Sequence, residues 1–495
     1  MSQLTSTFPG HGPGGNQPHH RRATSDSRST AYWVFVLLVL ALLSEETAYA
    51  YNLVTPALPG MAAELHTTQI AWVTTLFSLV GGISAPIVGK IADNHGKKRV
   101  LLWVVGVMAC GSLIVALAQS FPVVLLGRAM EGCAVAILPL AYSLMRDIFP
   151  KRLLALAISI ATSGIGLTTV LGPIIAGALI DNFTYRGVFF FLAIFPVALG
   201  ALVWMVVPES PVRMRGRLDW WGALLLGAAV GLILVGLSEG ATWGWSSRAV
   251  LGCFGGGAIL LVGWAAYERR AAEPLIDLSL LRSRALITTG IAQVTAQGII
   301  ALNFVLLSFL AQVPRSLGHT YGFGMSVSEL ARYTAPSGVI SMAMGFVVGF
   351  VARRRGARLP LWVAFVFAGA GSFTLGAWHD QHWQVQIGYF VYAIGGGALS
   401  AAIPVQVVDA VPAEKQAVSA GMVNLLGAIG AGLFVQLGFV ILNAHVGAVV
   451  EGQPIYTGTG FVLAYYFTAA ISLVGVVATL AMRHGTRDST VLVDD

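Results

Sequence analysis

Charged residues and cysteines are both scarce in this 495-residue chain. Asp, Glu, Lys and Arg make up only 10% of it, against roughly 25% in soluble domains, whereas 56% of its residues are hydrophobic. Its three cysteines, Cys110, Cys133 and Cys253, all lie in apolar runs and indicate neither a disulfide framework nor a metal site. The sequence also lacks a G-x-x-x-x-G-K-[ST] run. These absences argue against a soluble protein, a disulfide-stabilised protein and a pump driven by nucleotide hydrolysis.

Long apolar runs take up most of the chain. A run of about 20 apolar residues crosses a bilayer as a helix, because only a helix satisfies its own backbone there. We predict an all-α membrane protein with fourteen spans, at Tyr32–Thr55, Ile70–Ile91, Val100–Ala118, Phe121–Ile148, Leu154–Ile180, Val188–Val207, Trp220–Leu237, Val250–Tyr267, Ala285–Leu310, Leu330–Val351, Leu359–Trp378, Ile387–Val408, Ala417–Leu442 and Gly460–Met482. Spans 7 and 8 are short and rich in glycine, and interpreting them as one long loop would leave twelve spans.

A ten-residue signature occurs twice, each time between two apolar runs. It begins at Gly89 and again at Gly349, an offset of 260 residues, and a shorter pair, Asp147–Pro150 and Asp409–Pro412, follows at an offset of 262. Such repeats indicate two related halves packed face to face. In a membrane protein this arrangement permits alternating access to a site between the halves.

The repeat offset places the two middle spans between two six-helix bundles. We predict a disordered cytoplasmic tail (1–30), an N-terminal bundle (31–210), two accessory helices with their linkers (211–284), a C-terminal bundle (285–483) and a second cytoplasmic tail (484–495). If the N-terminus is cytoplasmic, 24 of the 29 lysine and arginine residues lie on the cytoplasmic side. The net charge of +7 therefore follows from topology in a cell (inner or plasma) membrane and requires no nucleic-acid partner.

The first copy of the signature resembles the loop motif of the major facilitator superfamily, G-x-x-x-D-x-x-G-x-[RK], at Gly89, Asp93, Gly96 and Lys98. The second copy keeps both glycines and the final basic residue but has Arg353 in place of the aspartate. The resemblance implies the major facilitator fold with two added helices and a cytoplasmic latch that depends on Asp93. The alternative is a charged hairpin without a switching role.

Two further motifs resemble the same superfamily. Leu126–Gly132 contains an intramembrane Arg128, which in the superfamily assists proton transfer. Gly172-Pro173 is similar to the Gly-Pro motif associated with antiporters, with Ala176 where a glycine is more usual, and ordinary packing of small residues is the alternative. The middle section, including Asp219–Gly222, is similar to that of the fourteen-span drug:proton antiporter family. That family usually has an aspartate near the end of span 1, where this chain has Ala50 and carries its carboxylates about one turn earlier.

Three charged residues fall at bilayer depth. A charge there costs at least about 2.5–3.5 kcal/mol, so each is a functional candidate. At about 1.5 Å per residue, Glu46 and Glu131 lie at similar depth and Arg128 lies one turn from Glu131. We expect Glu46 or Glu131 to carry a proton and Arg128 to modulate it. Glu45 points about 100° away from Glu46 on the helix. A static Arg128–Glu131 pair is the alternative.

Other side chains could line a mostly apolar cavity, although packing is an alternative for each: Tyr49, Trp72, Tyr142, Gln293, Gln297 and Phe304. We expect no metal, no cofactor and no catalytic centre. The sequence predicts a monomeric, proton-coupled exporter of small amphipathic molecules. The alternatives are the same fold moving a dedicated substrate (a lipid, a self-made antibiotic, an amino acid or a sugar) and a membrane scaffold that does not transport.

Overall fold

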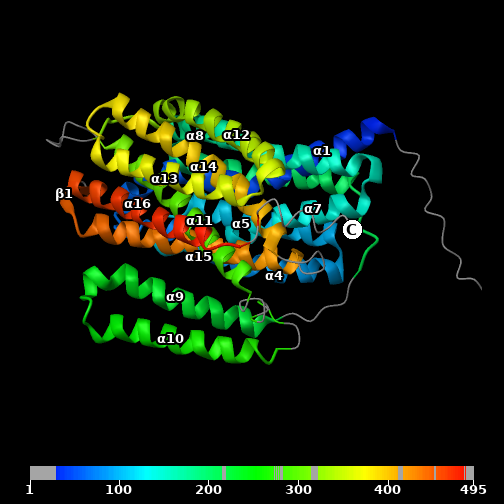
Figure 1. Cartoon of the computed structure of the whole chain (residues 1–495), viewed down its shortest axis with the longest axis horizontal. Coiled ribbons are helices and arrows are strands. Elements are labelled where there is room, and N and C mark those ends of the chain that lie inside the picture. Colours follow the sequence, from blue (N-terminus) through cyan, green and yellow to red (C-terminus); the bar gives the residue numbers. More distant parts are fainter. Residues whose placement is uncertain are drawn as a thin grey trace, which may run out of the picture.

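The computed structural model describes residues 29–213, 219–271, 274, 276, 278, 283–313, 322–410, 416–450, 453–483 and 485. Nearly all of the two predicted tails therefore lies outside the described residues. Helices dominate the described part, and they run along the long axis of the molecule (Figure 1).

The first group of helices corresponds to predicted spans 1 to 6. Its elements are α1 (Thr30–Ser44), α2 (Glu46–Asn52), the 3-10 helix η1 (Thr55–Ala57), α3 (Leu58–Glu64), α4 (Trp72–His95), α5 (Lys97–Leu117), α6 (Phe121–Gly132), the 3-10 helix η2 (Cys133–Ala136), α7 (Ile137–Ile148) and α8 (Lys151–Val206). We call this group the N bundle. The regular α-helix of span 1 is interrupted at Glu45, and that of span 4 is interrupted by the 3-10 turn η2 just after Glu131, so both breaks in regular helix lie beside charged residues.

The remaining helices form an accessory pair and a second bundle. The accessory pair is α9 (Trp220–Trp243) and α10 (Arg248–Glu268). The second group, which we call the C bundle, consists of α11 (Arg284–Gln312), α12 (Val327–Arg355), α13 (Arg358–Ala377), α14 (His382–Ala410), α15 (Gln416–Asn443), the β-hairpin β1 (Val446–Val450) and β2 (Gln453–Tyr456), and α16 (Gly458–Leu480). The hairpin is antiparallel, with Val446 opposite Tyr456.

Thirteen of the described helical stretches are long and apolar enough to cross a bilayer. Fourteen spans were predicted. The difference arises at spans 5 and 6, which form the single element α8 with a sharp change of direction at Thr184, where φ is 59°. Both accessory spans are helical, so the interpretation of this region as one long loop is wrong.

The accessory pair lies beside the two bundles, with α9 between α10 and the rest of the molecule (Figure 1). The indole of Trp72 on α4 donates a hydrogen bond to Ser238 Oγ on α9 at 3.1 Å. Exposed tryptophans mark both ends of α9, with Trp220 at its start and Trp243 at its last residue. Tryptophan prefers the membrane–water interface, so these residues are suited to fixing the depth of the pair.

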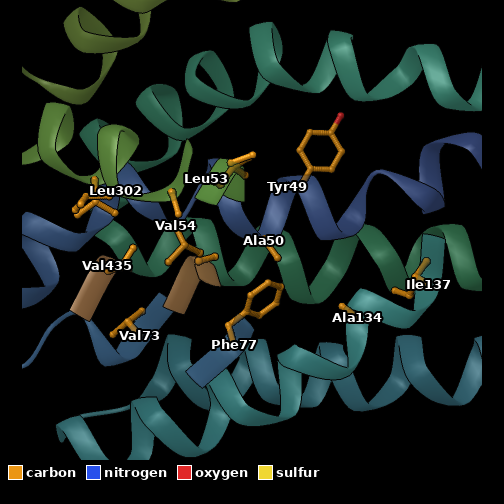
Figure 2. Packing of buried hydrophobic residues seen from close by; sticks show 14 of the residues in the cluster. Tyr49, Ala50, Leu53, Val54, Val73, Phe77, Ala134, Ile137, Leu302 and Val435 are labelled. Carbon is orange, nitrogen blue, oxygen red and sulfur yellow. The ribbon is translucent and has the colours of Figure 1, made fainter. Parts of the chain in front are cut away.

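The two ends of the molecule differ. We call the end that carries β1 and β2 the hairpin end (left in Figure 1), and the end that carries Lys97, Lys98 and Arg353 the basic end. At the hairpin end, Gln312 on α11 donates a hydrogen bond to the Pro56 carbonyl at 3.0 Å, which joins the bundles. Apolar side chains seal the same half: Figure 2 shows Leu302 and Val435 of the C bundle in one cluster with Val54 and Val73 of the N bundle. The hairpin end is therefore closed.

Candidate functional site

A buried ion pair lies inside the N bundle. Arg128 and Glu131 on α6 are both 0% exposed, and the Arg128 Nη1 group is ion-paired with Glu131 Oε2. Ser112 on α5 donates to the other carboxylate oxygen of Glu131, and Arg128 Nε donates to the Val73 carbonyl at 2.9 Å. The pair on α6 is thus also held by contacts from α4 and α5. Arg128 Nη2 has no hydrogen-bond partner among the described residues.

The aromatic surroundings of Arg128 strengthen this arrangement. Its guanidinium carbon lies 4.5 Å from the centroid of the Phe77 ring on α4 and 5.9 Å from that of Phe189 on α8. A cation over an aromatic face is attracted by the ring, and more so where water is excluded. Phe77 and Phe189 therefore both help to hold the buried cation in place.

Glu46 is buried differently. It begins α2, its side chain is 0% exposed, and within the described chain neither of its carboxylate oxygens has a hydrogen-bond partner. Its neighbour Glu45 accepts a hydrogen bond from the Thr168 hydroxyl at 2.8 Å and retains one unpaired oxygen. Thr47 donates to the Ala134 carbonyl of η2 at 2.9 Å, so the broken part of span 1 packs on the broken part of span 4. The structure brings spans 1 and 4 together, but Glu46 is not part of the Arg128–Glu131 pair.

The loop signature forms a second cluster, at the basic end. Lys97 is only 2% exposed, and its Nζ lies 2.6 Å from Asp147 Oδ2, which also accepts a hydrogen bond from Ser210 Oγ at 2.5 Å. Asp93 is 40% exposed and lies 3.7 Å from the same ammonium group. The buried acceptor of the cluster is therefore Asp147, and the expected latch residue Asp93 makes only the longer contact in this conformation. Gly96 is required by the turn, because its φ of 116° is one that side-chain-bearing residues rarely adopt.

Glu209, just beyond span 6, completes this cluster. Its carboxylate accepts hydrogen bonds from the backbone N–H groups of Lys98 at 2.9 Å and Arg99 at 3.1 Å, which caps the start of α5. An acidic group at a helix N-terminus is stabilised by the helix dipole. The Lys98 ammonium donates to the Trp204 carbonyl at 2.8 Å. At Gly89 an added Cβ would meet nothing within 4 Å, so close packing does not require glycine there in this conformation.

The Gly-Pro motif of span 5 lies where the bundles meet. Gly172 packs on Asn52 of α2, where an added Cβ would lie 3.0 Å from the Asn52 Cβ. Pro173 lines a small cavity together with Pro56 of the N bundle and Phe304 and Ser308 of α11. This cavity is in the closed half and is lined mainly by apolar side chains. The structure therefore brings the predicted residues Pro173 and Phe304 together.

The other predicted cavity residues are dispersed. Tyr49 is edge-on to Phe191 and Phe195, 6.1 and 6.0 Å away, and points away from the side of its helix on which Ala50 faces Phe77 (Figure 2). Trp72 faces the accessory helix α9, which indicates a role in packing.

Polar residues of α11 and α7 complete this set. Gln293 is buried against Gly427 of α15, whereas Gln297 and Tyr142 are half-buried. These three side chains are not collected around one pocket in the described part of the chain.

Five contributors were not predicted from the sequence: Lys97, Ser112, Thr168, Glu209 and Ser210. Lys97 lies inside the loop signature, but the motif itself points to Lys98. Ser112 and Thr168 sit in apolar runs, where no spacing ties them to a particular carboxylate. Glu209 and Ser210 lie between two prolines just after span 6, and this short polar insertion between spans was an available signal.

The sequence of this chain matches one protein family over most of its length. The family model described as Major Facilitator Superfamily matches residues 46–435, from α2 through the accessory pair to most of α15. The chain belongs to the major facilitator superfamily. It is therefore a membrane transporter, and its buried charged layer belongs to a protein that moves small molecules.

Curated superfamily relatives differ in what their names say they move. The chain is 26% identical to Multidrug resistance protein 3 of Bacillus subtilis (strain 168), with 70% of this chain and 66% of that protein covered. It is 28% identical to the tetracenomycin C resistance and export protein of Streptomyces glaucescens (83% and 76% covered). It is also 28% identical to the uridine/deoxyuridine transporter of Lactococcus lactis subsp. cremoris (83% and 86% covered).

Solved structures of superfamily transporters share the fold. A bacterial homolog of the human lysosomal transporter Spinster, in an inward-facing and occupied conformation, superposes with a TM-score of 0.65 at 15% identity, covering 92% of this chain and 97% of that one. A peptide transporter in complex with sulfate gives a TM-score of 0.64 at 15% identity, covering 90% and 93%. At this identity the likeness concerns the fold alone.

Proposed function

We propose that this transporter is a proton-coupled exporter of small amphipathic molecules that works by alternating access in the cell membrane. The positive-inside rule assigns the basic end and both termini to the cytoplasm, so that the hairpin end faces outward. The conformation described here, closed at the hairpin end, would then be closed to the outside. The fourteen-span drug:proton antiporter family is the subfamily that these features favour.

The single observation that carries proton coupling is Glu46. It is a fully buried carboxyl group at a helix break, and neither oxygen has a partner in the described structure. Burying an unpaired charge is expensive, whereas a protonated carboxyl group tolerates an apolar site. A group in this position can therefore exchange its proton when the bundles reorient and water reaches it.

The Arg128–Glu131 pair has a different role in this proposal. Glu131 is already paired with a guanidinium and hydrogen-bonded to Ser112, so both of its oxygens are occupied. We therefore assign the proton to Glu46 and consider Arg128 and Glu131 a fixed charge pair that organises spans 2, 3 and 4. Arg128 modulates the site through the positive charge that it holds next to the broken helices.

The test is substrate-driven proton flux in proteoliposomes. Glu46→Gln keeps the shape of the side chain but cannot release a proton, so we expect flux to fall by at least about a hundredfold, the lower end of what a positioned proton-transfer group contributes. Glu45→Gln is the matched control, because it is adjacent, also buried, and its amide oxygen can still accept from Thr168. Equal flux in Glu46→Gln and the parent protein would refute Glu46 as the carrier.

Movement of a dedicated substrate is the second candidate. The uridine/deoxyuridine relative, of which 86% is covered, supports it, because the same fold there serves a polar solute. Buried amides in the C bundle, such as Asn303, which donates to Ser372 Oγ at 3.1 Å, could bind such a solute. Uptake of labelled nucleosides into proteoliposomes would favour the dedicated substrate, and extrusion of cationic dyes would favour the amphipathic one.

We take the transporting unit to be a monomer.

A further inference from the structure

The start of α12 at the hairpin end is capped from two different bundles. The first N–H groups of a helix have no partner within it. Ser326 and Glu329 satisfy two of them reciprocally: Glu329 N donates to Ser326 Oγ at 3.2 Å, and Ser326 N donates to the Glu329 carboxylate at 2.9 Å. This capping box lies entirely within the C bundle.

The two N–H groups between Ser326 and Glu329 donate to a carboxylate of the N bundle. Val327 N donates to Asp181 Oδ1 at 3.1 Å, and Ser328 N donates to Asp181 Oδ2 at 3.0 Å. One carboxylate on α8 thus accepts both remaining donors of a helix in the other bundle. A negative charge at a helix N-terminus also interacts favourably with the helix dipole.

Gly177 makes this approach possible. It lies one turn before Asp181 on α8, and an added Cβ there would be 2.6 Å from Ser328 Cα. Only a residue without a side chain lets the two backbones come this close. The close contact and the double hydrogen bond therefore lie on the same face of α8.

We propose that Asp181 is a latch that holds the hairpin end closed by capping α12 across the bundle interface. The latch is reversible, because Asp181 is exposed and the N–H groups it binds lie at the rim, where water replaces the lost partners when the bundles separate. The capping box stays with α12 in either state, so the helix keeps its start when the latch opens. This inference rests on alternating access, which belongs to the proposed function.

Accessibility of a reporter cysteine tests the latch. Ser308 on α11 is 1% exposed and lines the small cavity between the bundles, so Ser308→Cys should react with a bulky maleimide only when the hairpin end opens. The native cysteines Cys110, Cys133 and Cys253 are replaced by alanine, and the labelling rate is measured on purified protein in nanodiscs. Asp181→Ala removes both acceptors, and we expect the labelling rate to rise about tenfold, which corresponds to about 1.4 kcal/mol.

Glu329→Gln is the matched control. It removes a carboxylate from the same helix start, but on the C-bundle side only, so we expect labelling within about twofold of the parent. Asp181→Asn retains one acceptor and should give an intermediate rate, and it serves as the second variant if Asp181→Ala does not fold.

Two results would overturn the latch. The first is that Asp181→Ala is labelled at the same rate as the parent protein. If Asp181→Ala does not fold, the same result in Asp181→Asn counts instead. The other is an equal rise in the Asp181 variant and Glu329→Gln, which would mean that the start of α12 simply loosens. The labelling assay needs neither substrate nor a proton gradient. The latch proposal can therefore be refuted while proton-coupled export is upheld, and proton-coupled export can be refuted while the latch is upheld.

Discussion

The buried ammonium group of Lys97 offers the sharpest test of how the basic end is held together. Lys97→Met keeps much of the length of the side chain and removes its charge. Asp147, 6% exposed and 2.6 Å from the ammonium group, would then keep Ser210 Oγ and the exposed Arg146, whose Nε lies 3.9 Å from its Oδ1, as its partners among the described residues. Breaking a buried ion pair from one side costs about 3–5 kcal/mol, because the other charge stays buried without compensation.

Asp93 supplies the comparison within the same cluster. Its carboxylate is 40% exposed and 3.7 Å from Lys97 Nζ, so Asp93→Asn should lower the free energy of unfolding by only about 0–1 kcal/mol. The Lys97→Met/Asp147→Asn double variant removes both charges and should regain most of the loss, since replacing a whole buried pair is often close to neutral.

The assay is the free energy of unfolding in a fixed mixed micelle, from the denaturant midpoint and slope of all four proteins. We expect the parent protein to be the most stable, followed by Asp93→Asn, then the double variant, and Lys97→Met to be the least stable. Lys97→Met as stable as Asp93→Asn would refute it, because the buried contact would then contribute no more than the exposed one. A double variant no more stable than Lys97→Met would refute the charge argument and leave packing as the cause.

Two further predictions concern packing. A Cβ at Gly395 on α14 would lie 2.2 Å from the Ala368 backbone nitrogen on α13, so Gly395→Ala should sharply reduce the yield of monodisperse protein. Gly252→Ala on α10 is the control and should not reduce the yield, because a Cβ there meets nothing within 4 Å. Equal yields of the two variants would contradict the close crossing of α13 and α14. Trp72→Phe and Ser238→Ala should each lower the free energy of unfolding by about 0.5–1.5 kcal/mol, because each removes the same hydrogen bond. The double variant should therefore lose no more stability than either single variant. Additive losses would show that the two side chains act independently.

The local parts of the site could be predicted from the sequence. Arg128 and Glu131 are three residues apart, and that spacing places them on one face of any helix, so their pairing needs no knowledge of the fold. The duplicated signature likewise predicts two related halves. The breaks in spans 1 and 4 were not predicted, because hydropathy reports the length of an apolar run and not its regularity.

Partners that come from other helices could not be predicted. Lys98 and Asp93 were chosen from the motif, yet the buried ammonium group belongs to Lys97, because the turn at Gly96 directs that side chain toward Asp147. Trp72 was expected to line a cavity and instead contacts the accessory pair, whose docking position no spacing encodes.

The sequence by itself determined that this chain spans a membrane many times and keeps charged residues inside its apolar runs, because hydropathy and helical spacing are properties of neighbouring residues. Only the tertiary structure decided which carboxyl group is left unpaired and which end of the molecule is closed. Among the described residues Glu46 has no hydrogen-bond partner, whereas Asp181 accepts from two N–H groups of α12, because of how separate helices pack. Those contacts depend on the relative placement of the bundles, which no local pattern records.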